Sequence, residues 1–269
     1  MTNNFTVGYL INGEEQNIEE SIVNFSSSYM KYSSGIEHEL YLLIKNCSKN
    51  SLDKIINDSF VNCNYKIFSV DNEGFDIGAY YQFAKQVDAK YIFLINTNSF
   101  LLTNNWLKKV SVGIEKGIDL VGTSASYEQL KLKNKNDNNF FAKFPNPHIR
   151  TNGFMIKRKL FIDIVSNYLN EIQKKNFLTK LDTYRFESGK IGLTSYLLNN
   201  DFKISLIGAN GRLYNVKNWP VSDTFRLNEQ ENLLISDRQT RFYDSLQYHK
   251  KKYFAYISWG NTINKSQTR

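Results

Sequence analysis

The sequence predicts an α/β fold with a mainly parallel central sheet flanked by helices, and two observations support this prediction. Short apolar segments alternate with longer segments of helical periodicity through the first half of the chain, as expected for consecutive βαβ units. Polar clusters directly follow two of the apolar segments, at the position where a parallel strand ends. With 269 residues, of which 41% are hydrophobic, the chain is long enough to bury such a core.

The first half of the chain is predicted to consist of alternating strands and helices. Strands are expected at residues 5–11, 39–44, 65–70, 91–95 and 119–122. Helices are expected at residues 14–32, 51–57, 77–86 and 106–116. In the first helix Ile18, Ile22 and Phe25 recur near helical spacing and form one apolar face. Strands joined through helices become parallel neighbours with right-handed crossovers.

The regular alternation ends near residue 122. The polar segment 128–143, rich in Asn and Lys, predicts a mobile loop before a Pro-Asn-Pro turn at 145–147. The elements expected next are an extended segment at 150–156, helices at 159–174 and 189–198, and a strand at 202–207. The aromatic-rich segment 226–256 predicts a helical C-terminal elaboration. Because the chain has no internal repeat and no Pro/Ser-rich linker, we expect a single domain over residues 1–269.

The charge of the chain restricts its partners. A formal net charge of +8 and a pI near 9.2 favour anionic ones, such as nucleotide phosphates or acidic lipid surfaces. The basic residues are dispersed and no nucleic-acid-binding signature is present, so we expect no nucleic acid among the partners. The N-terminus lacks the order of a secretory signal, and no apolar run approaches the ~20 residues that span a bilayer. We expect a cytoplasmic protein, and peripheral contact with the inner face of the membrane stays open.

Cysteines and several aromatic residues are predicted to serve the core. Cys47 and Cys63 cannot form a metal cluster by themselves and no CxxC is present, so both are expected to be small buried residues. Aromatic side chains at helical spacing are usually core residues. We therefore expect Trp106, Trp219, Tyr80 and Tyr81 to be core residues that do not stack on a sugar.

A first polar cluster follows the predicted strand at 65–70 and comprises Asp71, Asn72, Gly74, Asp76 and Gly78. Glycine allows close backbone approach, and Asp and Asn offer acceptors and donors for a base or a ribose. The spacing matches neither G-x-G-x-x-G nor G-x-x-x-x-G-K-[ST], which disfavours a dinucleotide fold and a P-loop. The alternative is an ordinary turn with Asp76 as a helix N-cap.

A second polar cluster follows the apolar strand at 91–95 and comprises Asn96, Thr97, Asn98 and Ser99. In an open α/β sheet ligands bind outside the carboxyl ends of the strands, so both clusters are expected to face one crevice. Together they suggest a nucleotide-sugar site, although the second cluster contains no carboxylate.

These two segments together resemble the GT-A glycosyltransferases, especially the family 2-like and rhamnan-synthesis F-like enzymes of surface polysaccharide assembly. Asn72-Glu73-Gly74 matches the N-x-G motif of such families, and residues 75–79 (FDIGA) are similar to the DIGA segment of rhamnan-synthesis-type proteins. The resemblance covers residues 5–125 in architecture and implies a GT-A-like (Rossmann-like) fold. With it, residues 1–125 become the nucleotide-binding half and residues 145–215 the acceptor-side half, ahead of the C-terminal elaboration at 226–256.

The resemblance also implies a donor substrate, a nucleotide-diphosphate sugar. Its base and ribose would lie near Asp71, Asn72, Gly74 and Asp76, and its ribose and diphosphate near Asn96 and Asn98. In the family, the second carboxylate of a D-x-D motif holds the Mg²⁺ or Mn²⁺ that bridges the diphosphate. This chain has Asn98 there, and a neutral amide is a far weaker ligand. A metal-independent enzyme, a weakly bound metal and a turn cap without catalytic meaning all stay open.

Without a metal, the leaving diphosphate needs positive charge or oriented donors from the protein. His148 and Arg150, just after the turn at 145–147, are the candidates. The planar guanidinium of Arg donates two parallel hydrogen bonds and stays charged. For His148, a turn residue with a satisfied ring is the alternative.

An acidic residue ahead of the helix at 189–198 completes the resemblance. In inverting members of the family a carboxylate here deprotonates the attacking acceptor hydroxyl, which has to lie within hydrogen-bond reach. Glu187 fits this position best, with Asp182 in reserve. Both could instead be first-turn acids that a helix dipole favours.

The sequence therefore predicts a glycosyltransferase of the hexosyl- or deoxyhexosyl-transferring class, with inversion at the anomeric carbon. Its partners would be a nucleotide sugar and a glycan or lipid-linked acceptor in surface polysaccharide assembly. The alternative is a catalytically inactive GT-A-like domain that binds a nucleotide or a glycan. The sequence does not identify the donor sugar, its base, the acceptor or the oligomeric state, and retention at the anomeric carbon stays open.

Overall fold

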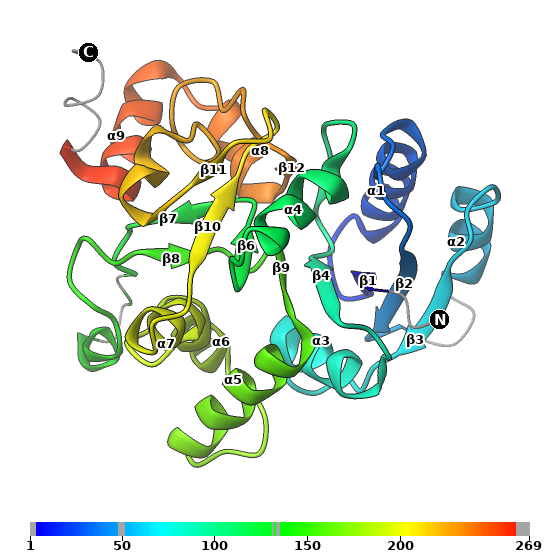
Figure 1. The fold of residues 1–269 in the computed structure, drawn as a ribbon, viewed down its shortest axis with the longest axis horizontal. Coiled ribbons are helices and arrows are strands. Elements are labelled where there is room, and N and C mark those ends of the chain that lie inside the picture. The colour runs from blue at the N-terminus through cyan, green and yellow to red at the C-terminus, as the bar shows by residue number, and fades with distance from the viewer. Residues whose placement is uncertain (1–3, 48–51, 131, 133–134, 262–269) are drawn as a thin grey trace.

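A mainly parallel sheet runs through the residues that the computed structural model describes, which are 4–47, 52–130, 132 and 135–261. These residues form an eight-stranded sheet in the order β11-β10-β6-β9-β4-β1-β2-β3 (Figure 1). Its strands are β1 (Phe5–Asn12), β2 (Glu39–Lys45), β3 (Lys66–Ser69), β4 (Tyr91–Ile95), β6 (Leu120–Gly122), β9 (Gly153–Lys157), β10 (Ile204–Ile207) and β11 (Leu213–Tyr214). In this sheet β9 and β11 run against the other strands. The predicted α/β fold with a mainly parallel sheet is confirmed.

Helices cover both faces of the sheet (Figure 1). One face packs against α1 (Ile18–Lys31), α2 (Asp53–Ser59) and α4 (Trp106–Glu115). The other packs against α3 (Phe75–Gln86), α5 (Arg158–Glu171), α6 (Lys180–Ser188) and α7 (Leu193–Asn199). Because successive strand residues point to opposite faces, Val7 and Tyr9 enter the first core and Leu10 enters the second. A strand covered on both faces is mostly apolar, which explains the apolar run at residues 7–11 of β1.

The strand order reverses between β1 and β4. The chain passes outward from β1 through α1, β2 and α2 to β3 on one face, then returns through α3 on the other face to β4, beside β1. In open α/β sheets ligands bind at such a switch point, in a crevice outside the carboxyl ends of the strands. The residues after Asn12 and after Ile95 therefore flank this crevice.

The second half of the chain adds short elements around the main sheet. β5 (Phe100–Leu101) pairs with β12 (Ile235–Ser236), and β7 (Ala125–Ser126) pairs with β8 (His148–Ile149). The remaining elements are the 3-10 helices η1 (Lys135–Phe140) and η2 (Val216–Val221) and the helices α8 (Arg238–Asp244) and α9 (Tyr248–Trp259). The pairing of β12 with β5 brings the C-terminal segment back to the edge at which β4 ends.

Helix boundaries in the second half differ from the predicted ones. The predicted helix at 189–198 begins only at Leu193, and α6 precedes it as a separate helix, which starts at a capping box formed by Thr179 and Asp182. In the segment 226–256, which is predicted to be helical, the first helix begins only at Arg238, because residues 235–236 form a strand. In the predicted mobile loop, residues 135–140 form η1, and residues 131, 133 and 134 lie outside the described part. Its mobility stays a prediction.

The predicted core residues are mostly buried. Trp106, Trp219 and Tyr80 are fully buried, as expected, whereas Tyr81 is half-buried and bonds to Ser166 through its hydroxyl. Both cysteines are free thiols and only half-buried, because each packs at the margin of the core that α1 and α2 cover. Of the predicted helix at 51–57, residue 51 lies outside the described residues. Among the helices that the structure describes, none has the length and apolar character to cross a bilayer.

Candidate functional site

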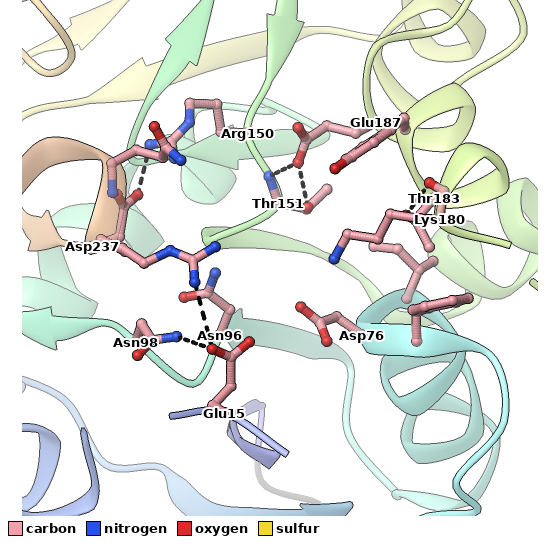
Figure 2. Close-up of a pocket in the computed structure, with 15 residues that line it drawn as sticks. Glu15, Asp76, Asn96, Asn98, Arg150, Thr151, Lys180, Thr183, Glu187 and Asp237 are labelled. Atoms are coloured by element: carbon pink, nitrogen blue, oxygen red, sulfur yellow. Dashed lines mark hydrogen bonds and ion pairs between the residues drawn. The ribbon is translucent and has the colours of Figure 1, made fainter. Parts of the chain in front are cut away.

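Two adjoining hollows open at the crevice between β1 and β4. The central hollow, of about 170 Å³, has Asp76, Asn96, Asn98, Lys180 and Glu187 in its wall (Figure 2). The outer hollow, of about 570 Å³, lies against the ends of β1 and β2 and the loop before α3. The two hollows share Glu15, Phe75, Asp76, Lys180 and Arg238 and therefore adjoin each other.

The N-terminus of α3 directs Asp76 into both hollows. Gly74 occupies the N-cap position with a φ of 82°, and a Cβ there would lie 2.4 Å from Oδ1 of Asn176, so the turn requires glycine. Asp76 lies within the first turn and is not the N-cap, so the alternative interpretation of this residue is wrong. Its carboxylate has no hydrogen-bond partner among the described residues. Burial raises the pKa of Asp76, Lys180 opposes the rise, and Glu15 adds to it.

Lys180 is a cation that the sequence did not single out. It is the first residue of α6, and its side chain extends into the space between Asp76 and Glu187 (Figure 2). Its ammonium lies 5.8 Å from the centre of the Phe75 ring and 6.0 Å from that of the Tyr184 ring. Within the described part of the chain it forms no ion pair, so its charge is available to an anionic ligand.

The loop after β3 is tied to the end of β2. The ammonium of Lys45 donates to the carbonyl oxygens of Asp71 and Glu73 at 3.2 and 3.0 Å. Burial lowers the pKa of Lys45, although nearby acids, Asp76 first among them, oppose this. Oδ1 of Asn72 accepts the backbone N–H of Asn46 at 2.8 Å. Asn72 and Gly74 line the outer hollow, whereas Asp71 is exposed and lines neither hollow.

The amide side chains of the second polar cluster form hydrogen bonds with other residues of the protein. Oδ1 of Asn98 accepts the hydroxyl of Ser21 at 3.0 Å, and its Nδ2 donates to Oε2 of Glu15 at 3.1 Å. Oδ1 of Asn96 accepts the hydroxyl of Ser99 at 2.5 Å. Asn98 thus orients Glu15, and this residue of the loop after β1 supplies the carboxylate that the second cluster lacks (Figure 2).

These residues do not fit a divalent cation held by the protein. A site that holds Mg²⁺ or Mn²⁺ through protein groups alone needs several oxygen ligands, preferably carboxylates. The oxygen of Asn98 already accepts a hydrogen bond, and Glu15 is engaged by Asn98 and lies 3.6 Å from a guanidinium nitrogen of Arg238. No group of three or more His, Cys, Asp and Glu side chains among the described residues could hold a metal ion. We therefore assign no chemical step to a metal.

Glu187 is held by the turn between β8 and β9. It lies in the last turn of α6, so it is not a first-turn acid. Its Oε2 accepts two hydrogen bonds from Thr151, one from the backbone N–H at 2.9 Å and one from the hydroxyl at 2.5 Å. Its other oxygen has no hydrogen bond within the described residues. One carboxylate oxygen is thus fixed and the other can meet a ligand.

Arg150 is engaged in a buried ion pair. Its Nη1 lies 2.6 Å from Oδ2 of Asp237, and its guanidinium packs over the ring of Phe225 at 4.1 Å. Oδ2 of Asp237 also accepts Nδ2 of Asn152 at 2.6 Å, while Oδ1 caps α8. Burial alone would raise the pKa of Asp237, but the Arg150 guanidinium and the other donors hold it below its usual value. Arg150 borders the central hollow with its charge already neutralised.

His148 lies beside the central hollow and not in it. A side hollow of about 260 Å³ contains His148 and shares Arg150 and Glu187 with the central one. The buried ring donates from Nδ1 to the carbonyl of Asn146 at 2.9 Å. Burial lowers the pKa of His148, so the ring is neutral at pH 7 and provides no charge for a phosphate.

Asp182, the second predicted acid, caps a helix. It is buried, and its carboxylate accepts Lys174 at 2.7 and 2.8 Å and the backbone N–H of Thr179 at 2.9 Å. Burial by itself raises the pKa of Asp182. The hydrogen bonds that its carboxylate accepts, first the one from Lys174, hold this pKa below its usual value. Asp182 lines none of the three hollows, so the interpretation as a first-turn acid is correct for this residue.

The residues that sequence reasoning missed carried detectable signals. Glu15 and Lys45 follow or end a predicted strand, so the rule that located Asn96 applies equally to them. Lys180 lies inside the sequence Thr-Lys-Leu-Asp, whose Thr179 and Asp182 form the spacing of a capping box and mark a helix start. Arg238 follows Asp237, which forms a capping box with Thr240 and likewise marks a helix start. Its position in the crevice depends on the return of the C-terminal segment, which no local pattern predicts.

Comparisons with known proteins were limited to similarities of fold. No protein-family model and no curated protein matches the sequence. A solved structure of 4-diphosphocytidyl-2C-methyl-D-erythritol synthase from Anaerococcus prevotii has 12% identity and a TM-score of 0.44, covering 77% of this chain and 89% of its own. The apo form of mouse xyloside xylosyltransferase 1 has 8% identity and a TM-score of 0.47, and the match covers 76% of this chain and 84% of the xylosyltransferase chain. At these TM-scores neither similarity carries an argument about activity.

The substitution Asp76→Asn is expected to stabilise the fold at pH 7 by about 1 kcal/mol, as substitutions that relieve strain at functional sites often do. Because the pKa of Asp76 is raised in the folded state, ionisation penalises that state. The penalty is absent below the unfolded pKa of ~3.9 and grows as the pH rises through the folded-state pKa. Urea unfolding between pH 3.5 and 8 should show the gain vanish at the acidic end. Equal stability of the two proteins at pH 7 would contradict this account.

The substitution Asn98→Asp is expected to lower the free energy of unfolding by about 1–3 kcal/mol at pH 7, because it removes the donor to Glu15 and opposes two carboxylates. The loss should shrink toward pH ~4, where one carboxylate takes up a proton. Exposed Asn62, changed to Asp, is the matched control. Thermal unfolding with and without Mn²⁺ measures both. A variant as stable as the unaltered protein, and stabilised further by Mn²⁺, would instead indicate a metal site at Asn98.

Proposed function

We propose that the protein is a glycosyltransferase that takes its sugar from a nucleotide-diphosphate donor. The observation that carries the proposal is the position of Lys180 between the carboxylates of Asp76 and Glu187, in a crevice at the carboxyl edge of the sheet. A phosphate needs a cation, and an attacking hydroxyl needs a carboxylate within reach. The central hollow offers both in one space.

The donor would occupy the adjoining central and outer hollows. The outer hollow, at about 570 Å³, is within the usual range for a ligand of this size, roughly 300–1,000 Å³. Base and ribose would lie against the loop that contains Asn72 and Gly74, and the diphosphate would turn toward Lys180 and Arg238. Asp76, free of protein partners among the described residues, would accept hydroxyls of the ribose or of the sugar.

Transfer would use Glu187 as the general base. An acceptor hydroxyl attacks the anomeric carbon, its proton passes to Glu187, and the bond from that carbon to the diphosphate oxygen breaks. The negative charge that develops on the leaving oxygen is stabilised by Lys180 and the exposed Arg238. Thr151 orients Glu187 through its two hydrogen bonds. Such a single displacement inverts the anomeric configuration.

In this proposal Lys180 and Arg238 stabilise the leaving diphosphate, in place of the Arg150 and His148 that the sequence suggested. Arg150 is a positioning residue, since its guanidinium is paired with Asp237 and it precedes Thr151 in the turn. His148 borders the acceptor side, and Asp182 takes no part because its oxygens are engaged. The acceptor would be a glycan or a lipid-linked glycan, on the cytoplasmic side of a membrane.

A panel of nucleotide-diphosphate sugars tests this proposal by thermal shift and by product formation. At least one donor should stabilise the protein and be turned over. Lys180→Gln should weaken donor binding about tenfold or more, the scale of one lost charge-assisted hydrogen bond. Glu187→Gln should retain donor binding and lower turnover by roughly 100-fold or more.

Lys190→Gln is the matched control for charge, because Lys190 is exposed and lies in none of the three hollows. Unchanged donor affinity in Lys180→Gln, or unchanged turnover in Glu187→Gln, contradicts the assigned roles. Donor binding without any turnover would favour the alternative, a domain that binds nucleotide sugars without catalysis.

A further inference from the structure

The exposed face of α9 carries two large aromatic side chains that no core requires. Tyr253 and Tyr256 are 62% and 57% exposed, and Phe144 across from them is 42% exposed. These side chains line a hollow of about 460 Å³, called here the platform hollow, together with Glu128 and Gln129. Burying large aromatic surface is favourable, so leaving three such side chains exposed around one concave space suggests a ligand.

The platform hollow adjoins the side hollow, which in turn adjoins the reaction centre. It shares Glu128 and Leu130 with the side hollow that contains His148. The side hollow in turn shares Arg150 and Glu187 with the central hollow. A series of adjoining hollows therefore runs from Glu187 past β7 and β8 to α9.

The lining of this path suits a carbohydrate chain. A sugar ring has an apolar face of C–H groups, which packs on the flat face of a tyrosine, and an edge of hydroxyls, which needs planar hydrogen-bonding groups. Tyr253 and Tyr256 offer the flat faces. Gln129 and Glu128, whose Oε2 is paired with Arg226, offer such groups in the same hollow. A lipid bilayer is flat and would not require a concave path that ends at Glu187.

We propose that the adjoining side and platform hollows bind successive sugar residues of a linear glycan, whose end reaches Glu187 and whose preceding residues stack on Tyr253 and Tyr256. This inference rests on the proposed function for the role of the chain end as acceptor. It commits the acceptor to an oligosaccharide of several residues and excludes a single sugar held at Glu187 alone.

Glycan binding can be tested without any turnover. The probes are linear malto-, cello-, xylo- and chito-hexaose and their monosaccharides, titrated by calorimetry into the full chain. At least one hexasaccharide should bind more tightly than its monosaccharide. The double variant Tyr253→Ala/Tyr256→Ala should weaken its binding about tenfold, the scale expected for two lost stacking contacts.

Three controls make the result specific. The double variant Tyr253→Phe/Tyr256→Phe keeps both flat faces and should retain affinity. Tyr248→Ala removes an exposed tyrosine of α9 outside the platform hollow and should leave affinity unchanged. Thermal shifts with nucleotide-diphosphate sugars should be the same in all variants, because no altered residue lines the central or outer hollow.

The outcomes separate this inference from the proposed function. Failure of every hexasaccharide to bind, or equal affinity of the Ala double variant, overturns the glycan path while the donor tests stand. Loss of sedimentation with phosphatidylglycerol vesicles in the Ala double variant, with glycan affinity unchanged, also overturns it and assigns the face to a membrane surface. Glycan binding that follows these expectations while no donor binds would support the path and contradict the proposed function.

Discussion

The geometry of the candidate site depends on the buried carboxylate of Asp237. This carboxylate joins Arg150 and Asn152 of the turn between β8 and β9 to the first turn of α8, 85 to 87 residues further along the chain. Thr151, between these two residues, provides both hydrogen bonds to Glu187. Removing one partner of a buried ion pair leaves an uncompensated charge, which commonly costs about 3–5 kcal/mol. The C-terminal segment is thus part of the site, although most of it lies outside the main sheet.

The balance of charge in the crevice explains how an anion could bind among several acids. Glu15 is paired with Asn98 and lies near Arg238, so its charge is partly offset. Asp76 has a pKa raised by burial, so protonating it costs less than protonating an exposed carboxylate. Lys180 remains available in the middle of the crevice. Oriented protein cations can stabilise a leaving diphosphate without reorganising during the reaction, which is the physical basis of the proposed role.

Local patterns in the sequence were sufficient for most strands of the main sheet, though not for β11, and for the residues at strand ends. The apolar run before Asn96 and the glycine-bearing loop before Asp76 mark the crevice, because strand ends follow directly from periodicity. The partners of these residues could not be predicted in the same way. Asn98 bonds to Glu15 across 83 positions and Arg150 to Asp237 across 87, and such pairings exist only once the chain has folded. For that reason Asn98 and Arg150 looked available to a ligand although the protein already uses them.

Nucleoside-diphosphate binding in excess chelator is the most direct measurement of whether protein groups alone hold the donor. Calorimetric titration with UDP, GDP, CDP and dTDP, in EDTA and separately in Mn²⁺, gives the affinity for each. The site described here predicts that at least one of them binds with a Kd that differs by no more than about twofold between the two conditions, a free-energy difference of about 0.4 kcal/mol. Binding that requires Mn²⁺ and disappears in EDTA would contradict it.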